Sequence, residues 1–241
     1  MMKKCFLLLT ICILSASHAL LAAGDPNELF VDLRKKVTSV KDYVADVKMN
    51  IFVSFMKVPP MNGRLYFKSP DKVKLERNGG ISILPKKTVN ISLNNLIPSG
   101  SVTVLDAGTE MVNGTNTRIL KVLPDNESAD IILSKIWVDE SRQLALRTET
   151  TTRENGTVKM ELEYGKYAAQ ALPDKVTITM DVKDYKMPKS LAMDYDEAND
   201  AQLMERAKKA KDKKGRIQIR YLSYRINSGL SDAVFVEKKK R

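Results

Sequence analysis

Cysteine and histidine are almost absent from this 241-residue sequence: Cys5, Cys12 and His18 are the only three, and all lie near the amino terminus. If the segment that carries them is removed, the remaining chain can form no disulfide, no thiol nucleophile, no histidine-dependent triad and no zinc site built on Cys or His. Aromatic residues make up only 6%, with one tryptophan. The stacking platforms on which glycosidases hold sugars are therefore scarce as well.

Residues 1–23 have the pattern of a secretory signal peptide. Lys3 and Lys4 form a basic start, an apolar run follows, and small residues up to Ala23 offer cleavage sites. We expect cleavage after Ala23, while cleavage after Ala19 and retention as a membrane anchor stay open as alternatives. Because eukaryotic secreted proteins of this size usually contain disulfides, a mature chain without cysteine favours the periplasm of a Gram-negative bacterium.

The chain is strongly basic. Its net charge is +11, and loss of Lys3 and Lys4 with the signal peptide leaves +9. Nucleic acid is not expected as a partner of an exported chain, whereas anionic membrane surfaces lie close to it. We predict a cluster that docks on a membrane or an acidic partner, made of Lys208, Lys209, Lys211, Lys213 and Lys214. A solvated helix end is the alternative explanation of this cluster.

The hydrophobic pattern predicts one helix followed by many strands. The helix begins at Pro26 with Asp25 as its N-cap. Its apolar face consists of Leu29, Phe30, Leu33, Val37 and Val40. From Tyr43 the period changes to two, which is typical of strands with one apolar face. Strands are predicted at 43–56, 61–68, 73–75, 89–93, 102–104, 117–123, 132–138, 144–151, 158–164, 176–182 and 215–221, with a final apolar segment at 233–236.

Two stretches depart from this strand pattern. Residues 94–107 are predicted to be a loop or a helix that leads into the short 102–104 segment. Residues 183–215 form a charged insert, much of which has the composition of a solvated helix. The predicted organisation is a signal peptide at 1–23 and a single domain at 24–241 that contains this insert.

Strands that are apolar on one face must cover that face, and the chain has too few helices to do so. We therefore expect a mainly β (α+β) fold, in which about nine to eleven antiparallel strands curl around their own apolar side as an open half-barrel. Such a half-barrel leaves a pocket. Met49, Met160 and Met180 face inward, where flexible side chains either adapt to an apolar ligand or fill gaps in a dry core.

The order of these elements resembles the LolA-like periplasmic carriers of outer-membrane lipoproteins. The resemblance lies in the amphipathic helix, in the stretches YVADVKMNI and GRLYFKSPDKVKLE, and in the closing RINSGLSDAVF. It implies an unclosed barrel of eleven strands with helices as a lid, and an apolar cavity for the acyl chains of a lipoprotein or related lipid. It also implies no catalysis, which agrees with a mature chain that lacks histidine and cysteine. We expect no metal and no cofactor. The chain departs from the family in its 183–215 insert and in the lid-locking arginine, for which Arg64 and Arg77 are the nearest candidates.

Thirteen residues are expected to line the lipid cavity. They are Val47, Met49, Ile51, Val53, Phe55, Leu65, Phe67, Val73, Leu75, Met160, Leu162, Ile178 and Met180. The partners implied are lipoprotein or lipid acyl chains, together with the inner- and outer-membrane surfaces or their transport proteins, bound by a monomer.

Two other functions stay open at this point. One is a periplasmic sensory or regulatory lipid-binding protein of the same fold, similar to the regulators of envelope stress. The other is a carboxylate-based enzyme, which would use pairs such as Asp139 with Glu140, or Asp194 with Asp196 and Glu197.

Overall fold

The computed structural model describes residues 24–53, 56–57, 59–77, 97–98, 100–153, 156–181 and 214–236. The predicted signal peptide, the predicted strand at 89–93 and nearly all of the charged insert lie outside these ranges. For Val53, Met56, Lys57, Arg77 and Asp181 only the backbone is described.

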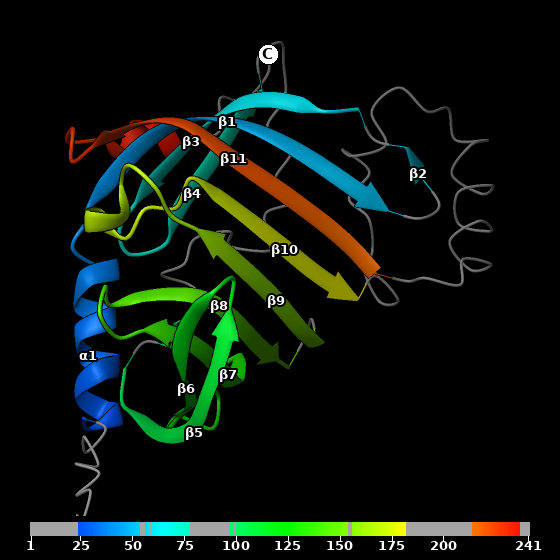
Figure 1. Cartoon of the computed structure of the whole chain (residues 1–241). Coiled ribbons are helices and arrows are strands. Elements are labelled where there is room, and N and C mark those ends of the chain that lie inside the picture. Colours follow the sequence, from blue (N-terminus) through cyan, green and yellow to red (C-terminus); the bar gives the residue numbers. More distant parts are fainter. Residues whose placement is uncertain are drawn as a thin grey trace, which may run out of the picture.

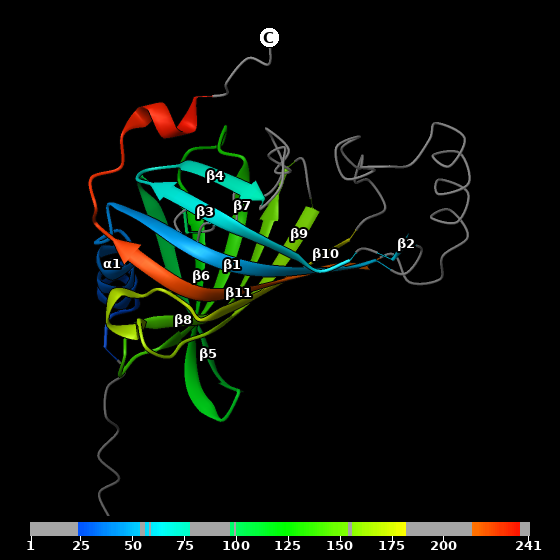
Figure 2. The ribbon, with the colours of Figure 1, turned by 90° about the horizontal axis from the view of Figure 1, so that it is seen from above.

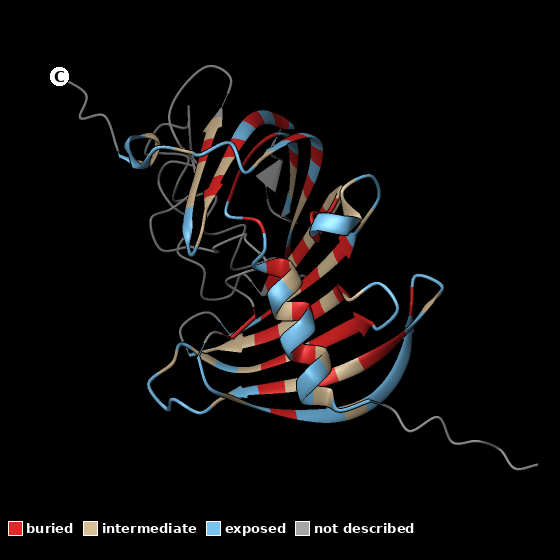
Figure 3. Ribbon diagram, turned by 90° about the vertical axis from the view of Figure 1, so that its left-hand side faces the viewer, coloured by how far each residue is buried: buried red, intermediate tan, exposed pale blue. Residues whose placement is uncertain are grey.

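Helix α1 spans Pro26–Val37 and begins where the sequence predicts. The carboxylate of Asp25 accepts a hydrogen bond of 2.9 Å from the backbone N–H of Asn27 and so caps the first turn. Phe30, Leu33 and Val37 are buried. The apolar stripe of α1 therefore faces the sheet, and Figure 3 shows the helix lying across the strands with exposed residues on its outer side.

The described strands form one antiparallel sheet (Figure 1). Their order is β4-β3-β1-β11-β10-β9-β8-β7-β6-β5, and β2 pairs with β1 off this path. The strands are β1 (Asp42–Val53), β2 (Met56–Lys57), β3 (Met61–Lys68), β4 (Lys72–Arg77), β5 (Val102–Val112), β6 (Thr115–Pro124), β7 (Ile131–Asp139), β8 (Leu144–Thr152), β9 (Gly156–Glu163), β10 (Lys175–Asp181) and β11 (Lys214–Ile226). Two 3-10 helices, η1 (Ala168–Gln170) and η3 (Asp232–Phe235), complete the described elements.

The sheet is open, because β4 and β5 end the path and do not pair with each other in the part of the chain that the structure describes. Figure 2 shows the long strands β1, β3 and β11 side by side, with the sheet curving away from them toward β5. The predicted mainly β, open antiparallel fold with an N-terminal helix is confirmed. The helix predicted within residues 183–215 lies outside the described residues.

Three predicted boundaries were wrong. The first strand ends at Val53 rather than at Met56, because Met56 and Lys57 form β2 and pair back onto Val53 and Phe52. Because the alternating pattern continues through Met56, the sequence does not show where β1 ends. The predicted helix ends at Val37, so Val40, which the pattern assigned to its apolar face, lies after the helix. In the final apolar segment, residues 233–235 belong to η3, which begins where the Ser231 hydroxyl accepts a hydrogen bond from the backbone N–H of Ala233.

The third wrong boundary is in β5, which continues to Val112 instead of stopping near residue 104. The pairing register with β6 shifts between Asp106 and Thr109. At this bulge Gly108 has a φ of 87°, and its N–H donates to the Asp106 carboxylate at 2.8 Å. The bulge interrupts the two-residue period, so the second half of the strand has no alternating pattern.

The first and last long strands, β1 and β11, are neighbours in the middle of the sheet. The carboxylate of Asp42 accepts bonds from the backbone N–H groups of Ser228 (2.8 Å) and Gly229 (3.1 Å). Asn227 and Gly229 both have left-handed backbones, with φ of 52° and 74°. Asn and Gly tolerate this conformation best, so the NSG sequence allows the chain after β11 to close onto the start of β1.

Candidate functional site

One face of the sheet, here called the inner face, is apolar across most of its width. The pairing register places one residue from each of eight strands in a single row. From β1 to β5 this row is Ile51, Ile217, Ile178, Met160, Thr148, Ile136, Leu120 and Asp106. Only its fifth and last members are polar. The alternating pattern of each strand therefore puts apolar side chains on the same face, in two buried clusters that Thr148 separates in this row.

The structure brings most of the predicted cavity residues together. Nine of the thirteen lie in one buried cluster: Val47, Met49, Leu65, Phe67, Leu75, Met160, Leu162, Ile178 and Met180. Ile51 and Val73 are partly buried against this cluster. Phe55 and the side chain of Val53 lie outside the described residues. The predicted inner positions are thus shared by neighbouring strands, and their role in lipid binding stays a prediction.

Aromatic rings close one end of this cluster. Tyr43 stacks on Phe67 with 5.1 Å between ring centroids, and Tyr224 packs edge-on against Tyr43 at 5.3 Å. Tyr224 also stacks on Tyr221, and its hydroxyl donates to the carbonyl of Pro173 at 2.7 Å. Burial raises the pKa of the Tyr43, Tyr221 and Tyr224 hydroxyls, so these groups stay neutral.

The other end of the cluster is less covered. Along β1 the inward side chains change from fully buried at Ala45 to partly buried at Ile51. The cross-strand partner of Ile51, Ile217, is also only partly buried. Among the described residues of β1 and β11, the inner face is therefore most accessible at Ile51 and Ile217, at the end opposite to the aromatic rings.

Three hydroxyl side chains interrupt the apolar surface of the inner face. Ser134, Thr148 and Thr150 are each fully buried, at 0% exposed. The hydroxyls of Ser134 and Thr150 lie 3.1 Å apart and share a hydrogen bond. The Thr148 hydroxyl has no hydrogen-bond partner among the described residues. A buried polar group in this state is costly, and a ligand atom that paired with it would offset the cost.

A buried arginine, Arg118, lies at the edge of the inner face where α1 begins. Its Nε and NH2 donate to the carboxylate of Asp106 at 2.9 and 2.7 Å, and its NH1 donates to the backbone carbonyl of Gly24 at 2.6 Å. Arg118 was not among the residues predicted from the sequence to form the site. The signal was present, because Arg118 has the same strand phase as Leu120 and Val122 and so had to point inward.

The two arginines named from the sequence have different surroundings. Arg64 is on the outer face, half exposed, and its Nε donates to the Asp46 carboxylate at 3.2 Å. Hydrogen bonds from Ser223 and Arg64 lower the pKa of Asp46. Arg64 is thus an ordinary surface residue of β3, and the side chain of Arg77 lies outside the described residues.

The carboxylates considered for catalysis have a structural role where they are described. Burial acts to raise the pKa of Asp139, but bonds from Ser141 and Arg142 outweigh it and hold the pKa below the usual value. Asp139 therefore fixes the turn between β7 and β8. Glu140 is exposed and lies 3.6 Å from Arg118. Asp194, Asp196 and Glu197 lie outside the described residues.

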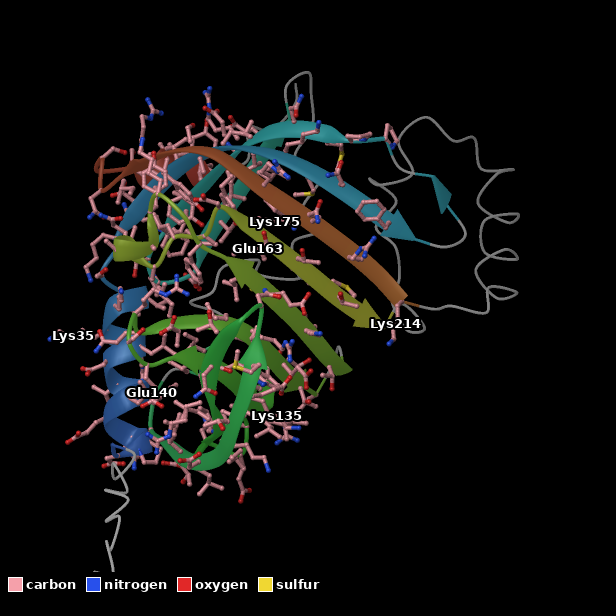
Figure 4. The ribbon with its side chains drawn as sticks, in the orientation of Figure 1. Lys35, Lys135, Glu140, Glu163, Lys175 and Lys214 are labelled. Atoms are coloured by element: carbon pink, nitrogen blue, oxygen red, sulfur yellow. The ribbon has the colours of Figure 1, made fainter. Side chains whose placement is uncertain are left out.

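The predicted docking cluster is described only at its last member. Lys214 is the first residue of β11 and is exposed at the end of that strand (Figure 4). Lys208, Lys209, Lys211 and Lys213 lie outside the described residues. In the described ranges, no group of three or more His, Cys, Asp or Glu side chains is arranged to hold a metal ion, and no helix has the length and apolar character needed to span a bilayer.

Comparison with known proteins gives matches in structure and not in sequence. No protein-family model matches the sequence, and no curated protein does. A domain from Vibrio parahaemolyticus named for outer membrane lipoprotein sorting matches with a TM-score of 0.53 and 10% identity, over 86% of this chain and 94% of that one. A LolA superfamily protein from Nitrosomonas europaea matches with a TM-score of 0.52 and 9% identity, over 89% and 99% of the two chains.

A third solved structure, a DUF1329 family protein from Desulfovibrio piger, matches with a TM-score of 0.51 and 15% identity, over 88% of this chain and 98% of that one. All three matches extend over nearly the whole of both chains, so they concern the complete sheet and not one hairpin of it. At these identities the likeness is one of architecture. The chain therefore has the fold of the LolA superfamily.

Proposed function

We propose that this protein is a periplasmic carrier that binds the acyl chains of an outer-membrane lipoprotein, or of a related lipid, on its inner face and moves them between membranes without catalysis. The observation that carries the proposal is the row of inner residues that crosses eight strands and is apolar at six positions. The LolA-like fold supports the same role, since two of the similar structures bear the names of lipoprotein sorting and of LolA.

The size of the inner face fits an acyl chain. From Ala45 to Ile51 the strand advances about 20 Å, at roughly 3.3 Å per residue. One acyl chain spans about half of the ~30 Å hydrocarbon core of a bilayer, so it can lie along this length. Each CH₂ group removed from water contributes about 0.8 kcal/mol, which makes an apolar surface sufficient for binding.

The two ends of the inner face suggest how a chain enters. Ile51 and Ile217 are partly buried, whereas the rings of Tyr43 and Tyr224 close the opposite end. The acyl chain enters past the isoleucines and its tip stops at the tyrosines. Met49, Met160 and Met180 adapt their unbranched side chains to the bound shape.

A direct test is mass spectrometry of organic extracts of the purified protein, beside binding of a fluorescent fatty acid. The wild type should yield acyl lipids and bind the probe. Met49→Asp should lose binding, because it places a charge on the inner face. The matched control is Asn50→Asp, which puts the same charge on the outer side of the same strand and should bind normally.

Loss of binding has to be separated from loss of folding. Circular dichroism of each variant reports the fold, and Met49→Leu provides an apolar substitution that should fold and bind. A wild type that yields no lipid and binds no probe, while Met49→Asp unfolds, would show a dry core and would reject the carrier.

Export is tested separately by intact mass. Protein isolated from the periplasm should begin at Gly24, since the predicted cleavage follows Ala23. Recovery of the full-length chain in the membrane fraction would replace the free carrier by an anchored one.

A further inference from the structure

The outer face of three neighbouring strands carries cations and no acids over a continuous area. The area consists of three cross-strand rows of outward residues on β1, β11 and β10. They are Lys48, Arg220 and Lys175, then Asn50, Gln218 and Thr177, then Phe52, Arg216 and Thr179. Four of these nine side chains are basic and none is acidic. We call Lys48, Lys175, Arg216 and Arg220, with Phe52, the basic strip.

The pairing register forces like charges into contact distance within this strip. Arg220 is the direct cross-strand partner of Lys48 on one side and of Lys175 on the other. Directly opposed side chains lie about 5 Å apart at Cβ, and like charges at that separation disfavour the pairing. The sheet therefore holds three cations in a row although each one repels the next.

Acidic side chains compensate only one end of this row. The Lys175 ammonium lies 2.7 Å from the Glu163 carboxylate, and both residues are labelled in Figure 4. Among the described residues, Lys48 and Arg220 form no ion pair, and both are exposed. An anionic partner that approached the outer face would be attracted by charge that the protein itself leaves uncompensated.

The far end of the strip combines a cation with an exposed aromatic ring. Arg216 lies over the ring of Phe52 at 4.6 Å, and Phe52 is 44% exposed. The two residues are direct partners on β1 and β11. An exposed ring beside an arginine suits the headgroup level of a bilayer, where the ring contacts acyl carbons and the guanidinium contacts phosphate.

We propose that the basic strip is the surface on which the protein docks to an anionic phospholipid membrane. Arg220 is four positions after Arg216, so the strip extends about 13 Å along the strand and can contact several headgroups. Docking by the outer face leaves the inner face free, so the proposal does not depend on acyl-chain binding.

The test is co-sedimentation with vesicles of equal parts phosphatidylglycerol and phosphatidylcholine, compared with phosphatidylcholine alone. The variant Lys48→Gln/Arg220→Gln removes the uncompensated pair. Each basic residue near an anionic surface strengthens binding about fivefold, so this variant should bind the anionic vesicles about 25-fold more weakly. Binding of the wild type should also fall between about 10 and about 150 mM salt, because the Debye length shortens from about 30 to about 8 Å.

A matched control removes the same charge elsewhere. Lys35→Gln/Lys41→Gln changes the net charge equally but lies on α1 and in the loop before β1, and it should bind nearly as the wild type does. Phe52→Ala should weaken binding while keeping its salt dependence.

Three results would overturn the proposal. The first is equal weakening by the strip variant and the control, which would mean that net charge alone acts. The second is a pair of results: a variant with Lys208, Lys209, Lys211 and Lys213 changed to Gln loses binding, and the strip variant binds as the wild type does. The third is no binding of the wild type to anionic vesicles at low salt, which would leave the strip for an acidic protein partner.

Discussion

Arg118 and Asp106 form an ion pair in which the guanidinium is almost completely buried, at 4% exposed, while the carboxylate side chain is 39% exposed. The same guanidinium donates to the carbonyl of Gly24, directly before α1. The pair therefore fixes the beginning of the helix to β5 and β6. Because its two members differ so much in exposure, their replacement should not cost the same.

Asp106→Ala should be the more damaging of the two replacements. It leaves a buried guanidinium without its carboxylate, and we expect a loss at the lower end of the ~3–5 kcal/mol found for broken buried pairs, because Glu140 remains nearby. Arg118→Met leaves a carboxylate that water can reach, with an expected loss of about 1 kcal/mol. Urea denaturation of both variants gives the two free energies of unfolding. Equal losses, or the reverse order, would show that the Arg118 guanidinium is not buried in solution.

The same pair should make the protein sensitive to acid. The Gly108 N–H and Arg118 both lower the pKa of Asp106 below 3.8. A carboxyl with a depressed pKa adds stability above its unfolded pKa, and this contribution disappears as pH falls through the folded pKa. The stability advantage of the wild type over Asp106→Asn should therefore be full near neutrality and shrink below pH 3.8. Denaturation curves measured across this range check it, and a constant difference would contradict it.

Thr148→Val should stabilise the ligand-free protein. The substitution removes a buried hydroxyl without a described partner and keeps the shape of the side chain, so we expect a gain of about 1 kcal/mol in the free energy of unfolding. Thr177→Val on the outer side of β10 is the control, and a surface change of this kind should stay within about 0.5 kcal/mol. A clear loss of stability in Thr148→Val would mean that its hydroxyl is hydrogen-bonded.

Gly63→Ala should be destabilising although Gly63 has an ordinary extended backbone. A Cβ at this position would lie 2.6 Å from the backbone carbonyl of Glu76 on the neighbouring β4. The two strands would have to separate, and overpacking of this kind costs about 1–3 kcal/mol. Gly24→Ala is the control, since its Cβ meets nothing within 4 Å. Thermal unfolding that leaves Gly63→Ala as stable as the control would show that β4 moves freely.

Local patterns predicted the parts of the fold that depend on neighbouring residues. The cap at Asp25 and the stripe of Phe30 and Leu33 specify α1 within a few positions, and the two-residue period of each strand determines which side chains face inward. The inward positions of the regular strands could therefore be predicted, as nine of the thirteen named residues in one buried cluster illustrate. The resemblance to LolA-like carriers rested on the same local features, and the likeness in structure confirms the fold that it implies.

Contacts between distant parts of the chain and irregular backbone could not be predicted from the hydrophobic pattern. Arg118 could be placed on the inner face from its phase, but its partners Asp106 and Gly24 come from separate elements and no spacing rule joins them. The bulge after Asp106 breaks the alternation that would have revealed the second half of β5. The row of Lys48, Arg220 and Lys175 could not be predicted either. Each of the three is an ordinary outward residue of its own strand, and only the pairing register shows that they are neighbours.

The position of β11 has a consequence for the order in which the molecule can fold. In the sheet order, β4, β3 and β1 lie on one side of β11 and the strands from β10 to β5 lie on the other. A chain that emerges amino end first can form these two partial sheets early, but among the described strands no pairing joins them until the last long strand arrives. Such non-local closure is slow. A chain cut before Lys214 should leave two partial sheets without the strand that pairs with both. A chain that passes through a translocation channel should lack this strand, and so remain incompletely folded, until almost all of it has passed.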